Sequence, residues 1–340
     1  MLIQFKRWIT LFTCTFLFAS CDQPPPLHHE TFFILGTLVE FTIADTPEPT
    51  AQAAILAAKD EMQRIHTRFA TNHSEGETAI FNQLPAHRPF LFSSEEQQLI
   101  LQAQLLQSQS QQAFQITLGA LDQLWGLSQS PMRSTPPSES SIQQLLPDID
   151  CLEPLANQQW QKRVASCQLD FGGIAKGYAI DQGIKMLKAH GIANAIINAG
   201  GDMRIIGTKH GTPWKIGIRH PRNATKTIAA VDLSGDVSIV TSGDYERFFI
   251  YNDRRYHHIL DPKTGYPSDR AQSTTVIADN ATLADGWSTA LFVLGKEGLP
   301  IVEKYGMAAL LIDHDGHLYQ NQRMDSMLKT AQHPPSLSQQ

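Results

Sequence analysis

The chain has 340 residues, of which 42% are apolar, and this suffices for one large domain or two small ones. Its formal net charge at pH 7 is −6, and its charged residues are scattered rather than collected in runs. Proteins that neutralise many phosphates are usually basic, so nucleic acid is not an expected partner.

The N-terminal segment has the features of a bacterial lipoprotein signal. Lys6 and Arg7 precede an apolar run from Trp8 to Ala19, which is too short for a membrane-spanning helix of about 20 residues. The run ends in Phe18-Ala19-Ser20-Cys21, which resembles the lipobox of lipoprotein signal peptidases. We expect residues 1–20 to be removed and Cys21 to carry lipid; an ordinary secretory signal is the alternative.

A short segment after Cys21 is expected to hold the folded domain away from a membrane. Pro24-Pro25-Pro26 makes a stiff spacer, so residues 21–30 are predicted to be a membrane-proximal linker. Asp22 resembles the inner-membrane retention signal of enteric bacteria. We therefore expect a lipid anchor in the bacterial inner membrane, with the protein facing the periplasm.

Two cysteines remain for the folded part, Cys151 and Cys167. An oxidising compartment permits a disulfide between them, and the sequence equally allows two unpaired thiols. No Cys-x-x-Cys or His pair accompanies them, so they do not predict a metal site.

The first half of the chain predicts one strand and two helices. Phe32 to Ile43 alternates apolar and polar residues, as a strand does, and is broken by Gly36. A helix follows, with an apolar stripe of Ile55, Ala58, Met62, Ile65 and Phe69. Ser93 and Glu96 have capping-box spacing, which predicts a second helix through about Leu106. Residues 128–145, rich in Ser, Pro and Gln, are predicted to be a loop or insertion.

The second half predicts short strands with helices between them. The strands are Val164–Leu169, Ala195–Asn198, Met203–Ile206, Trp214–Ile218, Ser273–Ala278, Met307–Ile312 and His317–Gln320, with a hairpin over Phe248–Leu260 turning at Asn252-Asp253. One helix is expected from Gly173 to Gly191, and another, capped by Thr282, to about Leu294. This order predicts an α+β fold with mixed, largely antiparallel sheets packed with helices. Residues 326–340 are predicted to be a disordered tail.

Two glycine-rich turns are candidate ligand loops. The first, Leu169 to Gly177, contains Asp170, Gly173 and Lys176, and its helix start and Lys suit a phosphate. It lacks the spacing of a Walker A loop or of a dinucleotide fold, and an ordinary strand–helix turn explains it as well. The second, Asn198 to Asp202, is open to the same two interpretations.

A histidine pair and an acid–hydroxyl pair are further candidates. His257 and His258 are adjacent in a predicted strand and face opposite sides, so one is expected to face a site and the other to be structural. Asp285 and Thr289 lie four residues apart on one helix face. Their oxygens suit magnesium, although helix capping explains the same spacing.

Together, in this order and behind a lipobox, these stretches resemble the FAD:protein FMN transferase family, the ApbE-like flavin transferases formerly described as thiamine-biosynthesis lipoproteins. The resemblance runs from about Phe33 to Gly295 and includes Leu124-Trp125-Gly126. It is strongest over Asp170–Lys176, Asn198–Asp202, Thr241–Phe249, His257–Gly265 and Ala284–Leu294. Residues 31–325 would then be a flavin transferase domain, with FAD in a cleft between layers.

The resemblance also implies site residues. The magnesium ligands would be Asp285, Thr289 and the backbone carbonyl of Gly173, and His258 would be the catalytic residue. The residues near FAD would be Leu35, Ala113, Phe114, Gln115, Asp170, Lys176 and Leu260. The chain departs from the family pattern at Leu35 (usually Met), Gln115 (usually Asp), Ala120 (usually Pro) and Phe171 (usually Leu). Gln115 keeps hydrogen-bonding ability but loses a charge.

The implied activity is magnesium-dependent transfer of FMN from FAD to a Thr or Ser hydroxyl of an acceptor protein, with release of AMP. Acceptors of the family are typically subunits of membrane redox complexes or electron carriers. Two alternatives stay open: an FAD pyrophosphatase giving free FMN and AMP, and a non-catalytic flavin-binding lipoprotein. Intact Asp285, Thr289, Lys176 and His258 argue against the second, and Gln115 argues slightly for it.

Overall fold

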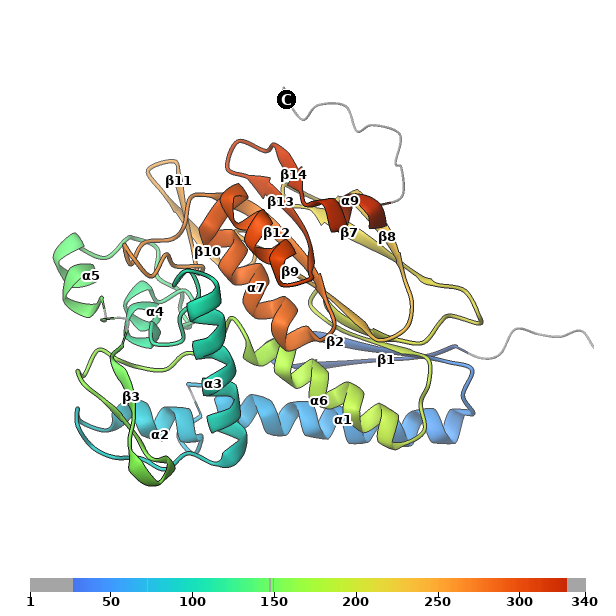
Figure 1. Ribbon diagram of the computed structural model, residues 1–340, viewed down its shortest axis with the longest axis horizontal. Coiled ribbons are helices and arrows are strands. Elements are labelled where there is room, and N and C mark those ends of the chain that lie inside the picture. Colours follow the sequence, from blue (N-terminus) through green and yellow to red (C-terminus); the bar gives the residue numbers. More distant parts are fainter. Residues whose placement is uncertain (1–26, 72, 147, 149, 329–340) are drawn as a thin grey trace, which may run out of the picture.

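The computed structural model describes residues 27–71, 73–146, 148 and 150–328. Its centre is an eight-stranded sheet in the order β1-β2-β5-β6-β9-β12-β13-β14, and every pairing in it is antiparallel (Figure 1). The strands are β1 (Leu27–Ile34), β2 (Thr37–Ala44), β5 (Ala195–Ala199), β6 (Asp202–Ile206), β9 (Val237–Gly243), β12 (Ala271–Ala278), β13 (Ala308–Asp313) and β14 (Leu318–Gln320).

Both faces of this sheet are covered. Helices α1 (Glu48–Phe69), α6 (Ala175–Ala189) and α7 (Ala281–Leu294) cover one face, and the ribbon of β7 (Trp214–His220) and β8 (Asn223–Leu233) with α9 (Gln322–Met327) covers the other. Neighbouring strand residues therefore enter different cores: Val276 packs under the helices and Ile277 under the ribbon. This arrangement confirms the α+β prediction.

A third apolar cluster joins two distant parts of the chain. It packs α4 (Gly119–Trp125) and α5 (Glu139–Leu145) against the hairpin of β10 (Phe248–Tyr251) and β11 (Arg254–His257). Trp125 stacks on Tyr256 at 5.7 Å between ring centroids, and its Nε1 donates to the Gly265 carbonyl at 2.8 Å. Packing of this aromatic pair fixes the C-terminal end of α4 beside the β10–β11 hairpin and the loop after it.

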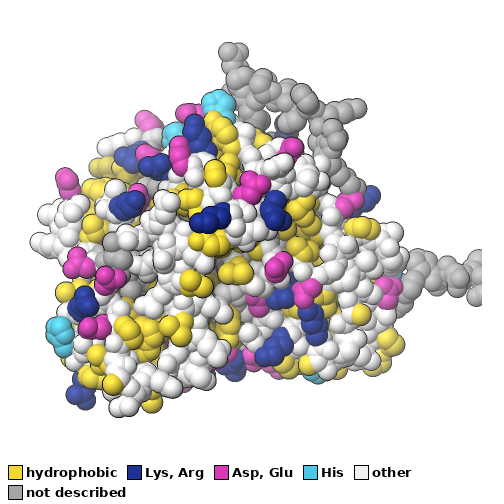
Figure 2. Space-filling view, in the orientation of Figure 1, with side chains coloured by type: hydrophobic (Ala, Val, Ile, Leu, Met, Phe, Trp, Pro, Cys, Tyr) yellow, Lys and Arg dark blue, Asp and Glu magenta, His cyan; other side chains and the backbone are white. Residues whose placement is uncertain are grey.

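The remaining elements lie around these layers. They are α2 (Glu77–Gln83), α3 (Ser94–Gln109), β3 (Leu152–Pro154), β4 (Trp160–Lys162), α8 (Leu299–Lys304) and the 3-10 turns Ala156–Gln158 and Gly295–Gly298. Figure 2 shows charged side chains of both signs interspersed over one face of the molecule. Among the described residues, no helix is long and apolar enough to cross a membrane.

Several local patterns are confirmed. The apolar stripe predicted for the first helix is buried in α1 at every position. Helix α6 ends before Gly191, which has φ +80°, as a helix C-terminal glycine commonly does. The β10–β11 hairpin turns at Asn252 and Asp253, both with positive φ.

Two strand predictions are corrected. Phe32 to Ile43 forms the β1–β2 hairpin rather than one strand, because Leu35 and Gly36 make a two-residue turn with φ +57° and +71°. Val164–Leu169 is not a strand: Leu169 N bonds the Asn82 side chain, and only Gln168 forms an isolated bridge, with Leu118. Nearby, Cys151 and Cys167 form a disulfide with Cα atoms 5.8 Å apart.

Three terminus and loop predictions also change. Asn280, not Thr282, caps α7, since the Asp181 carboxylate accepts the Thr282 hydroxyl at 2.5 Å. The capping box of α3 is half formed, because Glu77 rather than Glu96 accepts the Ser93 N–H. The expected loop 128–145 contains α5.

Ordered elements extend beyond the predicted boundaries of the transferase domain at both ends. Leu27–Glu30, expected in the linker 21–30, begins β1, and α9 extends to Met327, past the expected boundary at residue 325. The signal peptide 1–20, Cys21 and residues 329–340 of the tail lie outside the described residues.

Glu96 predicts a pH-dependent stability. Its Oε1 accepts the Thr78 hydroxyl at 2.7 Å, its Oε2 has no partner among the described residues, and burial raises its pKa to about 8. Above pH 4.5 the unfolded chain ionises this carboxyl while the folded chain keeps the proton, so its contribution to the free energy of unfolding is lost as pH rises toward 8. Glu96→Gln keeps the acceptor for Thr78 without the charge.

We expect the unfolding free energy of Glu96→Gln to rise relative to that of wild type as the pH goes from 5 to 8, by on the order of 1–3 kcal/mol in total. Urea unfolding at several pH values measures this difference. The exposed Glu75→Gln is the control and should show no such trend. A difference for Glu96→Gln that does not vary with pH would contradict the assignment.

Candidate active site

A cleft lies where the C-terminal end of β9 meets the starts of α6 and α7. Its first compartment encloses about 920 Å³, counting the open mouth, and is bounded on the far side by α4 and the loop after β11. Its second compartment reaches the β1–β2 turn and the end of α1. The two are continuous, since both are lined by Asp122, Asp170, Gly172, Lys176, Glu246, Arg247 and His258.

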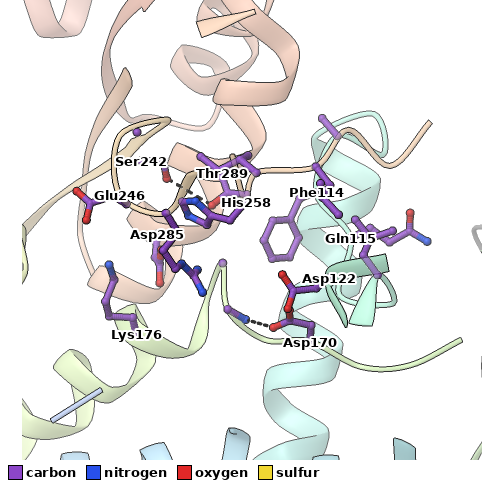
Figure 3. Close-up of a pocket in the computed structure, with 18 of the residues that line it drawn as sticks. Phe114, Gln115, Asp122, Asp170, Lys176, Ser242, Glu246, His258, Asp285 and Thr289 are labelled. Carbon is purple, nitrogen blue, oxygen red and sulfur yellow. Dashed lines mark hydrogen bonds between the residues drawn. The ribbon is translucent and has the colours of Figure 1, made fainter. Parts of the chain in front are cut away.

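The three predicted magnesium ligands all line the first compartment, and Figure 3 shows Asp285 and Thr289 there. A Cβ added at Gly173 would lie 3.2 Å from Thr289 Oγ1, so the turn before α6 touches the ligand face of α7. Asp285 Oδ2 accepts the Gly177 N–H at 2.8 Å. A carboxylate, a hydroxyl and a backbone carbonyl are the oxygen donors that magnesium takes.

Close contact between α6 and α7 makes this convergence possible. A side chain at Gly177 would overlap the Ala281 carbonyl, so only glycine lets the two backbones meet here. From α6, the Asp181 carboxylate accepts the N–H groups of Ala281 and Thr282 at 2.8 and 2.9 Å. These bonds satisfy the open start of α7 and fix the helix that carries Asp285 and Thr289.

The acids of this compartment repel one another. Burial and the nearby Asp202 carboxylate raise the pKa of Asp285 to about 7. Lys176 Nζ pairs with Asp202 at 2.6 Å, and although burial opposes its charge, Asp202 and Asp285 hold the Lys176 pKa above its usual value. A divalent cation at Asp285 would offset the repulsion, so the donor set fits magnesium.

The two adjacent histidines lie in different environments, but not through the predicted strand alternation, because β11 ends at His257 and His258 lies just beyond it. His257 is buried, bonds the Ser268 carbonyl through Nε2 at 2.8 Å and packs on Phe292. His258 lines both compartments. Its backbone N–H donates to the Arg247 carbonyl at 3.2 Å. Burial and the charge of Arg247 lower the His258 pKa, which leaves the imidazole neutral at pH 7.

One atom of His258 indicates a missing partner. Its Nδ1 is buried and has no hydrogen bond to any described residue. Buried polar atoms nearly always have a partner, so an unpartnered ring nitrogen in a residue that lines the cleft is consistent with a ligand there.

The other predicted residues all reach the cleft. Ala113, Phe114, Gln115, Asp170, Lys176 and Leu260 line the first compartment, and Leu35 lines the second. The Gln115 amide is engaged by its own segment, donating to Thr117 Oγ1 at 2.7 Å. Asp170 Oδ1 accepts the Gly172 N–H at 2.7 Å and so shapes the turn before α6.

The sequence interpretation missed Asp122, which lies on α4. Its carboxylate lies beside that of Asp170 (Figure 3). Burial, followed by the Asp170 charge, raises the pKa of Asp122 to about 7 against an opposing effect of Arg247. No spacing pattern marks this pair, because the third apolar cluster brings α4 to the cleft from a distant part of the chain.

Comparisons with known proteins agree with this fold. The ApbE family model matches residues 35–311. A relative from Rhodobacter capsulatus called FAD:protein FMN transferase is 31% identical over 318 residues, covering 91% of this chain and 60% of the relative. A relative of the same name from Vibrio cholerae serotype O1 is 27% identical over 313 residues, covering 90% of this chain and 93% of the relative.

Solved structures show the same architecture. The ApbE protein of Thermotoga maritima has a TM-score of 0.82 at 31% identity, covering 89% of this chain and 100% of that one. The apo flavinyl transferase ApbE of Pseudomonas stutzeri has a TM-score of 0.79 at 30% identity, covering 90% and 98%. Since the family model spans most of the chain and the fold matches solved members, this chain belongs to the ApbE family.

Proposed function

We propose that this protein transfers FMN from FAD to a Thr or Ser hydroxyl of an acceptor protein, with magnesium as cofactor and AMP as the other product. The observation that carries the proposal is the convergence of Gly173, Asp285 and Thr289 beside the orphaned Nδ1 of His258. The relatives named FAD:protein FMN transferase support the reaction class.

Magnesium, when bound at Asp285, Thr289 and the Gly173 carbonyl, would neutralise the pyrophosphate and polarise the phosphorus on the FMN side. The acceptor hydroxyl oxygen attacks that phosphorus, and the bond from phosphorus to the bridging oxygen breaks, so that AMP leaves with this oxygen. Neutral His258 accepts the hydroxyl proton, a role that its lowered pKa allows. Lys176, at the start of α6, lies where it can contact a phosphate.

The proposed setting is a lipid anchor at Cys21 in the bacterial inner membrane, with the domain facing the periplasm. The disulfide between Cys151 and Cys167 supports an oxidising compartment. The acceptor would then be a periplasm-facing protein, of which a membrane redox-complex subunit is the proposed type.

The decisive experiment incubates the protein with FAD, magnesium and a periplasmic acceptor carrying a Thr flavinylation site, then weighs the acceptor by mass spectrometry. A gain equal to one FMN, abolished by chelator, supports the transferase. Free FMN and AMP without a mass gain would identify a pyrophosphatase instead. The acceptor must be one that a known family enzyme modifies. If FAD then stays bound and unreacted, the protein is a carrier.

Asp285 tests the metal site. It supplies the only charged donor of the three proposed ligands, so Asp285→Ala should lower magnesium-dependent transfer by at least about 100-fold. Asp285→Asn keeps an acceptor for the Gly177 N–H and should show a similar loss with the fold intact. Product formation and magnesium titration calorimetry measure the two effects. Exposed Asp279→Asn, just before α7, is the matched control, and unchanged magnesium affinity in Asp285→Asn would refute the site.

Asp122 predicts a pH dependence of FAD binding. Below pH 7 it is protonated, and above pH 7 it adds a negative charge beside Asp170 that opposes the anionic pyrophosphate. We expect FAD affinity, measured by flavin fluorescence at saturating magnesium, to fall by about threefold or more from pH 6 to pH 8. Asp122→Asn should remove most of this fall. An equally steep profile in that variant would assign the dependence to another group.

A further inference from the structure

Arg247 stands at the junction of the two cleft compartments and lines both. It follows β9 and directly precedes β10, so two strands fix its backbone. Its carbonyl accepts the His258 N–H, and its charge contributes to the lowered pKa of His258. The guanidinium and the site histidine therefore face the same volume.

Arg247 differs from three neighbouring arginines in having no carboxylate of a described residue within ion-pair distance, although its charge acts on the Asp122 carboxyl. Arg219 pairs with Glu246 at 3.0 Å, and Arg222 and Arg255 pair with Asp244 at 2.6 and 3.2 Å. Within the described part of the chain, Arg247 forms no ion pair, and its one side-chain bond is Nη1 to Ser128 Oγ at 2.6 Å. A guanidinium has five N–H donors, so most of its donors remain available.

The second cation of the cleft is already compensated. Lys176 is paired with Asp202 at 2.6 Å, while Asp122 and Asp170 add further negative charge. Of the Lys and Arg side chains that line the cleft in the described part of the chain, Arg247 alone has no carboxylate within ion-pair distance. Planar guanidinium groups bind phosphate oxygens in a bidentate manner.

We propose that Arg247 is the diphosphate-binding residue of this cleft, with its guanidinium contacting phosphate oxygens of the dinucleotide; this rests on the proposed function. Ser128 accepts from Nη1, and the other N–H groups of this exposed guanidinium stay available to a phosphate. The backbone bond from His258 to Arg247 keeps the phosphate-binding and proton-accepting groups in a fixed relation. Substitution of the Arg247 side chain leaves this backbone bond in place.

The test compares ligands with and without phosphates. Dissociation constants of FAD, FMN and riboflavin are measured by flavin fluorescence, and that of AMP by calorimetry, for wild type, Arg247→Ala and Arg247→Lys. We expect Arg247→Ala to weaken FAD binding by about tenfold or more while riboflavin binding changes less than about twofold. Arg247→Lys keeps the charge without the planar fork and should lie between. If Arg247→Ala loses affinity for FMN, the contact is with the flavin-side phosphate. If it loses affinity for AMP, the contact is with the phosphate on the adenosine side.

Chemical rescue and a matched variant complete the design. Guanidinium ion should restore part of the FAD affinity of Arg247→Ala, whereas sodium chloride of equal ionic strength should not. Arg254→Ala, on the same hairpin with its guanidinium over Tyr256, is the control and should bind FAD as wild type does.

Equal losses for FAD and riboflavin, or FAD binding by Arg247→Ala within about twofold of wild type, would overturn the assignment. Because binding is measured without an acceptor, this result is separate from the outcome of the transfer assay. A protein that binds FAD through Arg247 but modifies no acceptor refutes the transferase and keeps the phosphate contact.

Discussion

The backbone contact between α6 and α7 is the constraint on which the site depends. Gly177 lets the first turn of α6 touch the start of α7, and Asp181 then receives the N–H groups that open α7. The Gly177 N–H in turn bonds Asp285. One short stretch of α6 thus sets the position of α7, the orientation of its carboxylate and the path of the turn through Gly173. A larger residue at Gly177 would act on the cleft through the helix pair rather than through any ligand contact.

The cleft combines an anionic lining with a proposed anionic ligand. Asp122, Asp170, Asp202 and Asp285 all face it or border it, and Lys176 compensates only Asp202 directly. Burial, followed by the neighbouring charges of Asp170 and Asp202, raises the pKa of Asp122 and of Asp285 to about 7, which reflects the cost of holding charges close together away from water. Such a lining favours ligands that arrive with a divalent cation, and this supports magnesium as part of the proposed reaction.

Local patterns in the sequence predicted most elements, and distant contacts account for what was missed. The stripe of α1 and the turn at Asn252 and Asp253 depend on residues close in sequence, and both are confirmed. Thr282 was wrong as a cap because Asp181, from another helix, takes its hydroxyl and leaves Asn280 to cap α7. The family resemblance predicted residues far apart in the sequence, such as Leu35 and Leu260, and the structure places them in one cleft. It did not predict Asp122, whose position depends on the packing of Trp125 against the β10–β11 hairpin.

The disulfide has a consequence for where a working cleft can be made. Cys167 lies three residues before Asp170, and its bond to Cys151 closes a loop of 16 residues next to the turn that shapes the cleft. In a chain-entropy description, a cross-link of this span restricts the unfolded chain by about 3 kcal/mol. A reducing compartment would remove that restriction at the segment that leads into α6. In the proposed periplasmic setting, oxidation after export would therefore also complete the rigid frame around the turn at Asp170.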